Sequence, residues 1–178
     1  VEGGILLDYA ELHDMNPDLA GWIKIEGTKV DYPVMQTSTN NKDYYLKRDF
    51  DKQDSVRGCI YAREECDLDK PSDNITIYGH NMANRTMFGG LQSYGETLKF
   101  DDNAVMYIYQ PGRQLTYKFF ACIPYDTSHI LYYHDFKDEK VFNAFFEALG
   151  KAASDPKYKS DTNQNAFYSA EGCVNVDK

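Results

Sequence analysis

The chain has 178 residues, enough for one domain with a substantial core. Its 28 acidic residues outnumber the 19 Lys and Arg, giving a formal charge of −9. This balance argues against nucleic acids and anionic membrane surfaces as partners, because both need clustered basic side chains. Aromatic residues make up 15% of the chain, which favours a β-rich protein with a groove.

The hydrophobic pattern predicts a helical lead-in in residues 1–20 and a barrel in residues 21–178, together forming a single domain. Short runs of alternating or β-branched residues, separated by turn residues, predict the strands. These runs are 21–25, 30–35, 58–62, 75–78, 104–109 and 115–123, the last two joined by a hairpin. Residues 135–151 have one apolar face and predict a helix, whereas residues 152–178 are polar and weakly patterned. Strands separated by short turns, with one late helix, indicate a mainly β fold of the barrel type.

The run 75–82 is the most informative stretch of the sequence. A β-branched strand leads into Gly79, and the turn then presents His80 followed by Asn81. A turn after a strand can hold a titratable side chain beside a cleft, and imidazole is the commonest acid/base group near neutral pH. His80 is therefore the candidate catalytic residue. Asn81 either orients His80 or simply favours the turn geometry.

The cysteines show no spacing typical of a metal site, so we expect neither a metal nor another cofactor. Cys59 and Cys122 lie in apolar strand patterns, where cysteine acts as a small buried hydrophobe. Cys66 lies among acidic residues, whose charges are expected to raise its pKa and make it a poor nucleophile. We expect the acidic clusters, including Glu64, to form a solvated face and not a calcium site. Cys173 remains as a nucleophile.

Five motifs occur in an order that is similar to that of a known family. They are YAELHDMNPDLAGWIKIEGTKVDYPVMQ (9–36), NNKDYYLKRDF (40–50), GCIYARE (58–64), ITIYGHNM (75–82) and TMFGGL (86–91). In this order and spacing the chain resembles the class B sortases, which are cysteine transpeptidases of bacterial cell surfaces. The resemblance covers residues 9 to about 149. It implies an eight-stranded antiparallel β-barrel with an N-terminal helix and a helix between strands six and seven, where the sequence pattern predicts residues 135–151.

The resemblance also implies a reaction. A thiolate attacks the Thr carbonyl of an NPQTN-like sorting motif, leaving a thioacyl enzyme, and an amine of the cell wall or of a pilin then resolves it. The partners implied are surface proteins that carry the motif, and a peptidoglycan or pilin amine. His80 matches the general acid/base of the family. The family also uses an arginine to hold the substrate, and no residue of this sequence is identified with it.

The region around Cys173 matches the family less closely than the region around His80. Residues 168–172 do not match the strand that precedes the family's cysteine, and no arginine follows among residues 174–178. Two alternatives stay open. Either Cys173 is a divergent nucleophile, or residues 168–178 lead towards a strand that lies beyond Lys178 and the barrel is incomplete at its C-terminal end.

The resemblance places such a domain on the outer face of a bacterial membrane, held by an anchor that would precede Val1. Two other functions remain open. A sortase-like binding or scaffold module would lack the catalytic strand, and a hydrolysing cysteine peptidase would release its product instead of transferring it to an amine.

Overall fold

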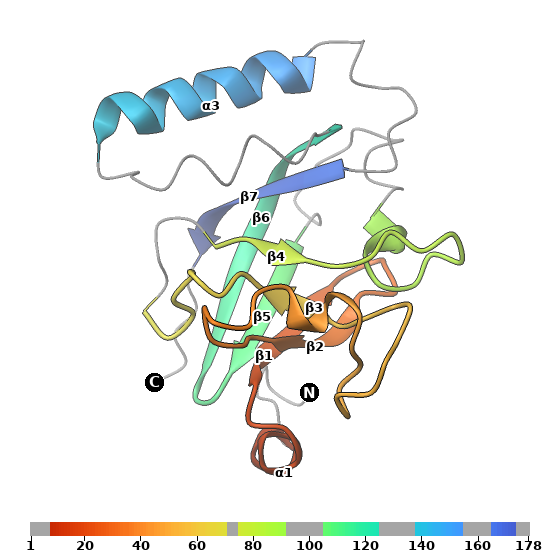
Figure 1. The fold of residues 1–178 in the computed structure, drawn as a ribbon. Helices are drawn as coiled ribbons and strands as arrows, with labels where there is room; N and C mark the ends of the chain where they lie inside the picture. Colours follow the sequence, from red (N-terminus) through yellow and green to blue (C-terminus); the bar gives the residue numbers. More distant parts are fainter. Residues whose placement is uncertain (1–7, 71–74, 92–104, 125–137, 155–164, 174–178) are drawn as a thin grey trace.

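The computed structural model describes residues 8–70, 75–91, 105–124, 138–154 and 165–173. Within them the protein is mainly β and forms one sheet of seven strands (Figure 1). The order of the strands across the sheet is β4-β3-β2-β1-β5-β6-β7. In chain order they are β1 (Leu19–Ile25), β2 (Asp31–Met35), β3 (Ile60–Ala62), β4 (Ile77–Tyr78), β5 (Val105–Gln110), β6 (Arg113–Pro124) and β7 (Asn165–Cys173).

The described residues also contain two α-helices and two short 3₁₀ helices. The predicted N-terminal helix is confirmed in a shorter form, as α1 (Tyr9–Met15). The predicted late helix is confirmed as α3 (Glu139–Ser154), which lies between β6 and β7 in the chain. Asp138 begins α3, because its Oδ1 accepts the main-chain N–H of Lys140 at 2.8 Å. Two short 3₁₀ helices, η1 (Tyr44–Leu46) and η2 (Phe88–Leu91), lie in the connections.

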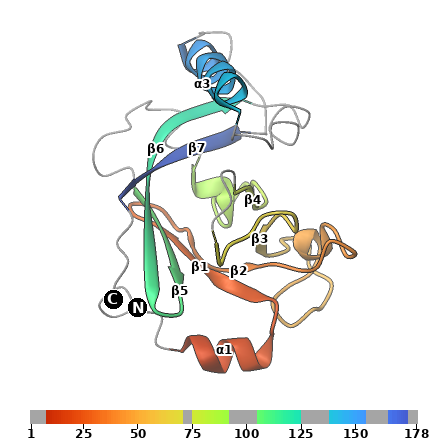
Figure 2. The same ribbon diagram turned by 90° about the vertical axis from the view of Figure 1, so that its left-hand side faces the viewer.

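The predicted antiparallel barrel is corrected in one respect, because β3 runs parallel to its neighbour β2. The described residues contain seven strands, and the predicted eighth strand stays a prediction. A parallel pair needs a crossover connection, which here is the segment 36–59 with η1 inside it. The sheet is curled into a half-barrel, as the turned view shows (Figure 2).

The two faces of the sheet's β2-β3-β4 end carry different hydrophobic clusters. Alternate residues of a strand point to opposite faces, so Val34 and Ile60 join one cluster while Met35 and Tyr61 join the other. We call the first the aliphatic cluster. Its buried members are Ile23, Ile25, Val30, Val34, Ile60, Ala62, Leu68, Met87, Leu91, Ile108, Leu115 and Phe119. We call the second the tyrosine cluster, in which Leu19, Met35, Tyr45, Cys59 and Tyr61 are buried and Tyr9, Leu12, Tyr44, Phe50 and Tyr78 pack against them.

The hydrophobic pattern did not predict strand β7, because residues 152–178 are weakly patterned, whereas the resemblance implied a strand after the late helix. In the structure β7 pairs antiparallel with β6 from Asn165, opposite Pro124, to Cys173, opposite Thr116. The twelve-residue β6 extends well beyond its hairpin with β5 and offers main-chain groups to a partner strand. Tertiary pairing has therefore overridden a weak local preference.

Candidate active site

His80 lies just after β4, in the turn that the sequence singled out. Its Nε2 is 2.8 Å from the main-chain oxygen of Leu46, the last residue of η1. Its own main-chain oxygen accepts the N–H of Phe88 at 3.0 Å. Both the ring and the backbone of His80 are therefore held by segments that are distant in the sequence.

Two glycines allow the turn around His80 to close. A Cβ on Gly79 would lie 2.3 Å from Cδ1 of Ile60, and one on Gly89 would lie 2.2 Å from the main-chain oxygen of Met82. At Gly89 the clash would be with main-chain atoms, so this close approach requires glycine, whereas at Gly79 the side chains of Ile60 and Phe88 would have to move. Asn81 is exposed, and its main chain pairs with Met87. Its predicted role in orienting His80 stays a prediction.

A network of hydrogen bonds holds η1, the segment that contacts His80. The hydroxyl of the buried Tyr45 accepts Nδ2 of Asn16 at 2.8 Å and donates to Oδ2 of Asp18 at 2.8 Å. Asn16 Nδ2 also donates to the main-chain oxygen of Phe50 at 2.7 Å. This network was not predicted, and its only signal in the sequence is the Asn-Pro-Asp run that directly follows the first helix.

A charged group lies behind β4, on the side of the tyrosine cluster. The guanidinium of Arg63 lies 5.8 Å from the ring centroid of Tyr78 and contacts Asp43 at 3.6 Å. Tyr61 donates to Oδ1 of Asp43 at 2.8 Å and stacks on Tyr78. The expected solvated acidic face is wrong at Glu64, which is buried. Its Oε1 accepts the main-chain N–H of Asp43 at 2.9 Å, and this long-range bond explains the burial.

The two cysteines whose side chains the structure describes are poor nucleophiles. Cys59 is buried as predicted, and burial, with smaller contributions from Asp49 and Asp51, raises the pKa of its thiol to about 12. The pKa of Cys66 is also raised, as predicted. The main cause is burial, with carboxylates a smaller one, so the predicted cause is corrected. Neither thiol ionises readily near neutral pH.

The other two cysteines are placed through their backbone. Cys122 lies within β6, opposite Phe167 of β7, and Cys173 is the last residue of β7. The strands β4 and β7 are the two edges of the sheet. Following the parallel and antiparallel pairings from one edge to the other shows that these two strands run in opposite directions, as their arrowheads show (Figure 1). His80 thus lies just after one edge strand, and Cys173 is the last residue of the other. Their predicted partnership stays a prediction.

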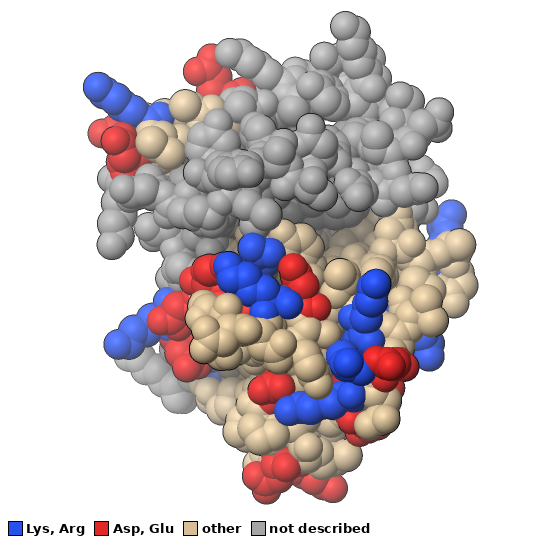
Figure 3. Space-filling view, in the orientation of Figure 1, with Lys and Arg blue, Asp and Glu red and all other residues tan. Residues whose placement is uncertain are grey.

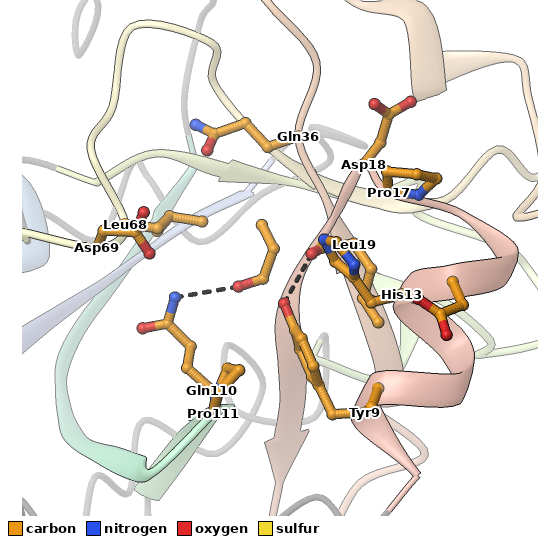
Figure 4. A pocket seen from close by; sticks show the side chains of 13 residues that line it. Tyr9, His13, Pro17, Asp18, Leu19, Gln36, Leu68, Asp69, Gln110 and Pro111 are labelled. Atoms are coloured by element: carbon orange, nitrogen blue, oxygen red, sulfur yellow. Dashed lines mark hydrogen bonds between the residues drawn. The ribbon is translucent and has the colours of Figure 1, made fainter.

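One cavity among the described residues is separate from His80. It has a volume of about 570 Å³ and lies between α1, the start of β1 and the turn between β5 and β6 (Figure 4). Tyr9 closes one wall by donating to the main-chain oxygen of Leu19 at 2.7 Å, and the buried Gln110 closes another by donating to that of Ala20 at 3.0 Å. Its polar lining includes Asp14, Asp18, Asp69 and His13.

Three observations concern a metal site, a charged binding surface and a membrane-spanning helix. Among the described residues, no group of three or more His, Cys, Asp or Glu side chains is arranged to hold a metal ion. Basic and acidic side chains alternate over the described surface in Figure 3, so this face offers no broad patch of one sign. No helix in the described part of the chain has both the length and the apolar character needed to cross a membrane.

Comparison with known sequences identifies two similar proteins. Sortase B of Staphylococcus aureus is 26% identical over 139 residues, which cover 78% of this chain and 56% of that protein. Sortase B of Listeria monocytogenes is 33% identical over 94 residues, covering 53% of this chain and 37% of the relative. The match with these relatives thus spans about half of their length or less. No protein-family model matches the chain.

Comparison with solved structures leads to the same group. Sortase B of Clostridium perfringens has a TM-score of 0.72 and 28% identity, covering 83% of this chain and 80% of that one. The S. aureus sortase B–substrate complex has a TM-score of 0.72 and 24% identity, covering 88% of this chain and 70% of that one, and supports the fold. The chain is therefore homologous to sortase B, both in sequence and in its curled, mainly β fold.

Proposed function

Because the chain is homologous to sortase B, we propose that it is a cysteine transpeptidase of the class B sortase type. Its substrate is a surface protein with a C-terminal NPQTN-like motif, cut after Thr. The acceptor is an amine of the cell wall or of a pilin. The domain works on the outer face of a bacterial membrane. S. aureus sortase B has been solved with its substrate, which supports a peptide-binding role.

The reaction proceeds in two acyl-transfer steps. A cysteine thiolate adds to the Thr carbonyl, and the C–N bond breaks as the leaving amine takes a proton from His80. An acceptor amine then attacks the thioester, gives a proton back to His80 and displaces the thiolate. The protons and the thiolate are thus restored in each cycle, so neither a metal nor a cofactor is required.

One observation carries the proposal for His80. Its ring is fixed by the main-chain oxygen of Leu46 at 2.8 Å, at the end of an edge strand and on a turn that two glycines allow to close. A general acid/base must keep its orientation while the substrate amine leaves and the acceptor amine enters. Asn81, the next residue, is proposed only as a weak orienting group.

Cys173 is the proposed nucleophile, partly by exclusion. Burial raises the pKa of both Cys59 and Cys66, and Cys122 lies in the interior of a paired strand. Cys173 ends an edge strand, and a peptide can pair with a sheet at such an edge.

The test is cleavage of a quenched-fluorescent NPQTN-type peptide by this chain, with and without triglycine. We expect cleavage, and a ligated triglycine product on mass spectrometry. His80→Ala and Cys173→Ala should each abolish both, whereas His13→Ala should keep them. Hydrolysis without ligation would indicate a peptidase instead. Activity that survives Cys173→Ala would overturn the assignment of the nucleophile.

A binding or scaffold module is the second candidate, and one observation favours it. The edge strands β4 and β7 run in opposite directions, so His80, just after β4, and Cys173, at the end of β7, follow the chain towards opposite ends of these strands. If the folded chain binds the peptide in a fluorescence-polarisation assay but neither cuts it nor forms a thioester, the module is the better description.

A further inference from the structure

The hydrogen bond of His80 identifies which of its ring nitrogens carries a proton. A main-chain carbonyl oxygen can only accept a hydrogen bond, so the contact of 2.8 Å requires a proton on Nε2. In a neutral imidazole the other nitrogen, Nδ1, is then the one with the free lone pair. The acceptor of this bond, Leu46, lies within the motif at residues 40–50, but no role was predicted for it because its contribution comes from the main chain and not from the side chain.

The position of the Leu46 carbonyl is built into the fold. Leu46 donates its own N–H to the main-chain oxygen of Asp43 at 3.0 Å, and the neighbouring Tyr45 oxygen accepts the N–H of Cys59 at 2.9 Å. Gly58, with φ of +57°, passes directly against this turn. A Cβ on Gly58 would lie 2.5 Å from the main-chain oxygens of both Leu46 and Tyr45.

We propose that the Leu46 carbonyl is a positioning group for His80, which fixes the Nε2–H tautomer and leaves Nδ1 as the nitrogen that exchanges protons with the reacting amines. The inference deepens the proposed function and rests on it for the role of Nδ1. Fixing one nitrogen through a bond to the other is the usual way in which proteins set a histidine tautomer.

Three glycine variants test the contact. Gly58→Ala places a methyl group against the two carbonyls and should move Leu46 away from His80. Gly27→Ala and Gly112→Ala are matched controls, because both glycines have φ of +72° and neither Cβ would have a neighbour within 4 Å. The three variants share the strain of alanine in the left-handed region, and only Gly58→Ala disturbs the carbonyl.

The readout is the tautomer of His80, followed by long-range ¹H–¹⁵N correlation spectra at alkaline pH, with His80→Gln used to assign the signals. We expect the Nε2–H tautomer in the parent and in both controls, and a mixture of tautomers in Gly58→Ala. An Nδ1–H tautomer in the parent, or an unchanged spectrum in a folded Gly58→Ala, would overturn the proposal. If Gly58→Ala does not fold, the spectrum of the parent alone still decides.

Peptide cleavage separates this inference from the proposed function. With an active parent, Gly58→Ala should lower kcat on the order of tenfold, as loss of an orienting partner typically does, while KM changes little. The controls should keep the parental kcat. An inert parent with the Nε2–H tautomer would contradict the proposed function and leave the positioning contact supported. An active Gly58→Ala with the parental kcat would contradict the role of the carbonyl in catalysis.

Discussion

The two faces of the β2-β3-β4 end are built from different chemistry. The aliphatic cluster fills one face with Ile, Val, Leu and Met side chains that have no polar group to satisfy. The tyrosine cluster on the other face holds Tyr45 and Tyr61, whose hydroxyls bond to Asp18 and Asp43. Apolar burial tolerates small shifts, whereas a hydrogen-bonded network fixes positions and loses energy when one member is left unpaired.

His80 belongs to the face with the fixed positions. It lies two residues after Tyr78 of the tyrosine cluster, and its ring contacts η1, which carries the buried Tyr45. A chain of contacts thus leads from Asn16, at the end of α1, through Tyr45 to the carbonyl that holds His80. The aliphatic face thus supplies stability to this end of the sheet, and the tyrosine face supplies the geometry of the candidate site.

The largest expected effect is loss of stability on the aliphatic face. Ile60 is fully buried there, so Ile60→Ala should lower the free energy of unfolding by about 2–5 kcal/mol, through lost burial and the cavity left behind. Urea unfolding followed by circular dichroism measures this, with the 89% exposed Val56→Ala as control. A loss below about 1 kcal/mol would place the main core elsewhere.

On the tyrosine face the critical group is polar. Asn16→Ala removes the donor to the buried Tyr45 hydroxyl and to the partly buried Phe50 carbonyl, so both oxygens lose this hydrogen bond. We expect a loss of about 2 kcal/mol in urea unfolding. The exposed Asn143→Ala of α3 is the matched control and should change little. Equal effects for the two variants would show that the network adds nothing to stability.

Alkaline pH should destabilise the tyrosine face selectively. Burial raises the pKa of the Cys59 thiol from 9.0 to about 12, so above pH 9 the unfolded chain loses this proton while the folded chain keeps it. Stability should therefore fall by about 1.4 kcal/mol per pH unit from pH 9 until the thiol ionises in the folded state near pH 12. Burial also raises the pKa of Tyr45 and Tyr61 above the ordinary 10.0, which steepens the fall at higher pH.

Urea unfolding at a series of pH values tests this window. Cys59→Ala lowers the stability at neutral pH, but it should make the decline between pH 9 and 10 shallower, leaving the part that comes from the Cys66 thiol. A variant with the same slope as the parent would show that the thiol already ionises in the folded protein.

Much of the first six strands could be predicted from the sequence, because their patterns are local. The alternation in Gly21–Ile25 and the turn at Gln110–Arg113 predict β1 and the β5-β6 hairpin, and the structure confirms both. The parallel pairing of β2 with β3 could not be predicted, since local pattern does not give the direction in which a distant strand returns. β7 was missed for a related reason: its pairing with β6 outweighs a weak pattern.

The candidate site divides in the same way. His80 could be predicted because its residue type and its place after a β-branched strand can be read directly from the sequence. Its catalytic role stays a prediction. The carbonyl of Leu46 leaves no such mark, since any residue at that position supplies one. Glu64 was predicted to be solvated, because its neighbours in the sequence do not indicate the hydrogen bond from the main-chain N–H of Asp43, which is 21 residues away in the chain.

The smallest expected effect concerns the rim of the tyrosine face. Lys52 pairs with Asp18 at 3.0 Å and holds a left-handed backbone with φ of 63°. Lys52→Met removes only the ion pair, which is half-exposed and screened, so the loss should be about 0.5 kcal/mol or less. Lys52→Gly removes the same pair but also relieves a backbone cost of about 1 kcal/mol, partly offset by the greater freedom of glycine when unfolded. The Gly variant should therefore be the more stable of the two in urea unfolding. A less stable Gly variant would mean that the ring of contacts around Asp18 depends on the stem of Lys52 as well as on its charge.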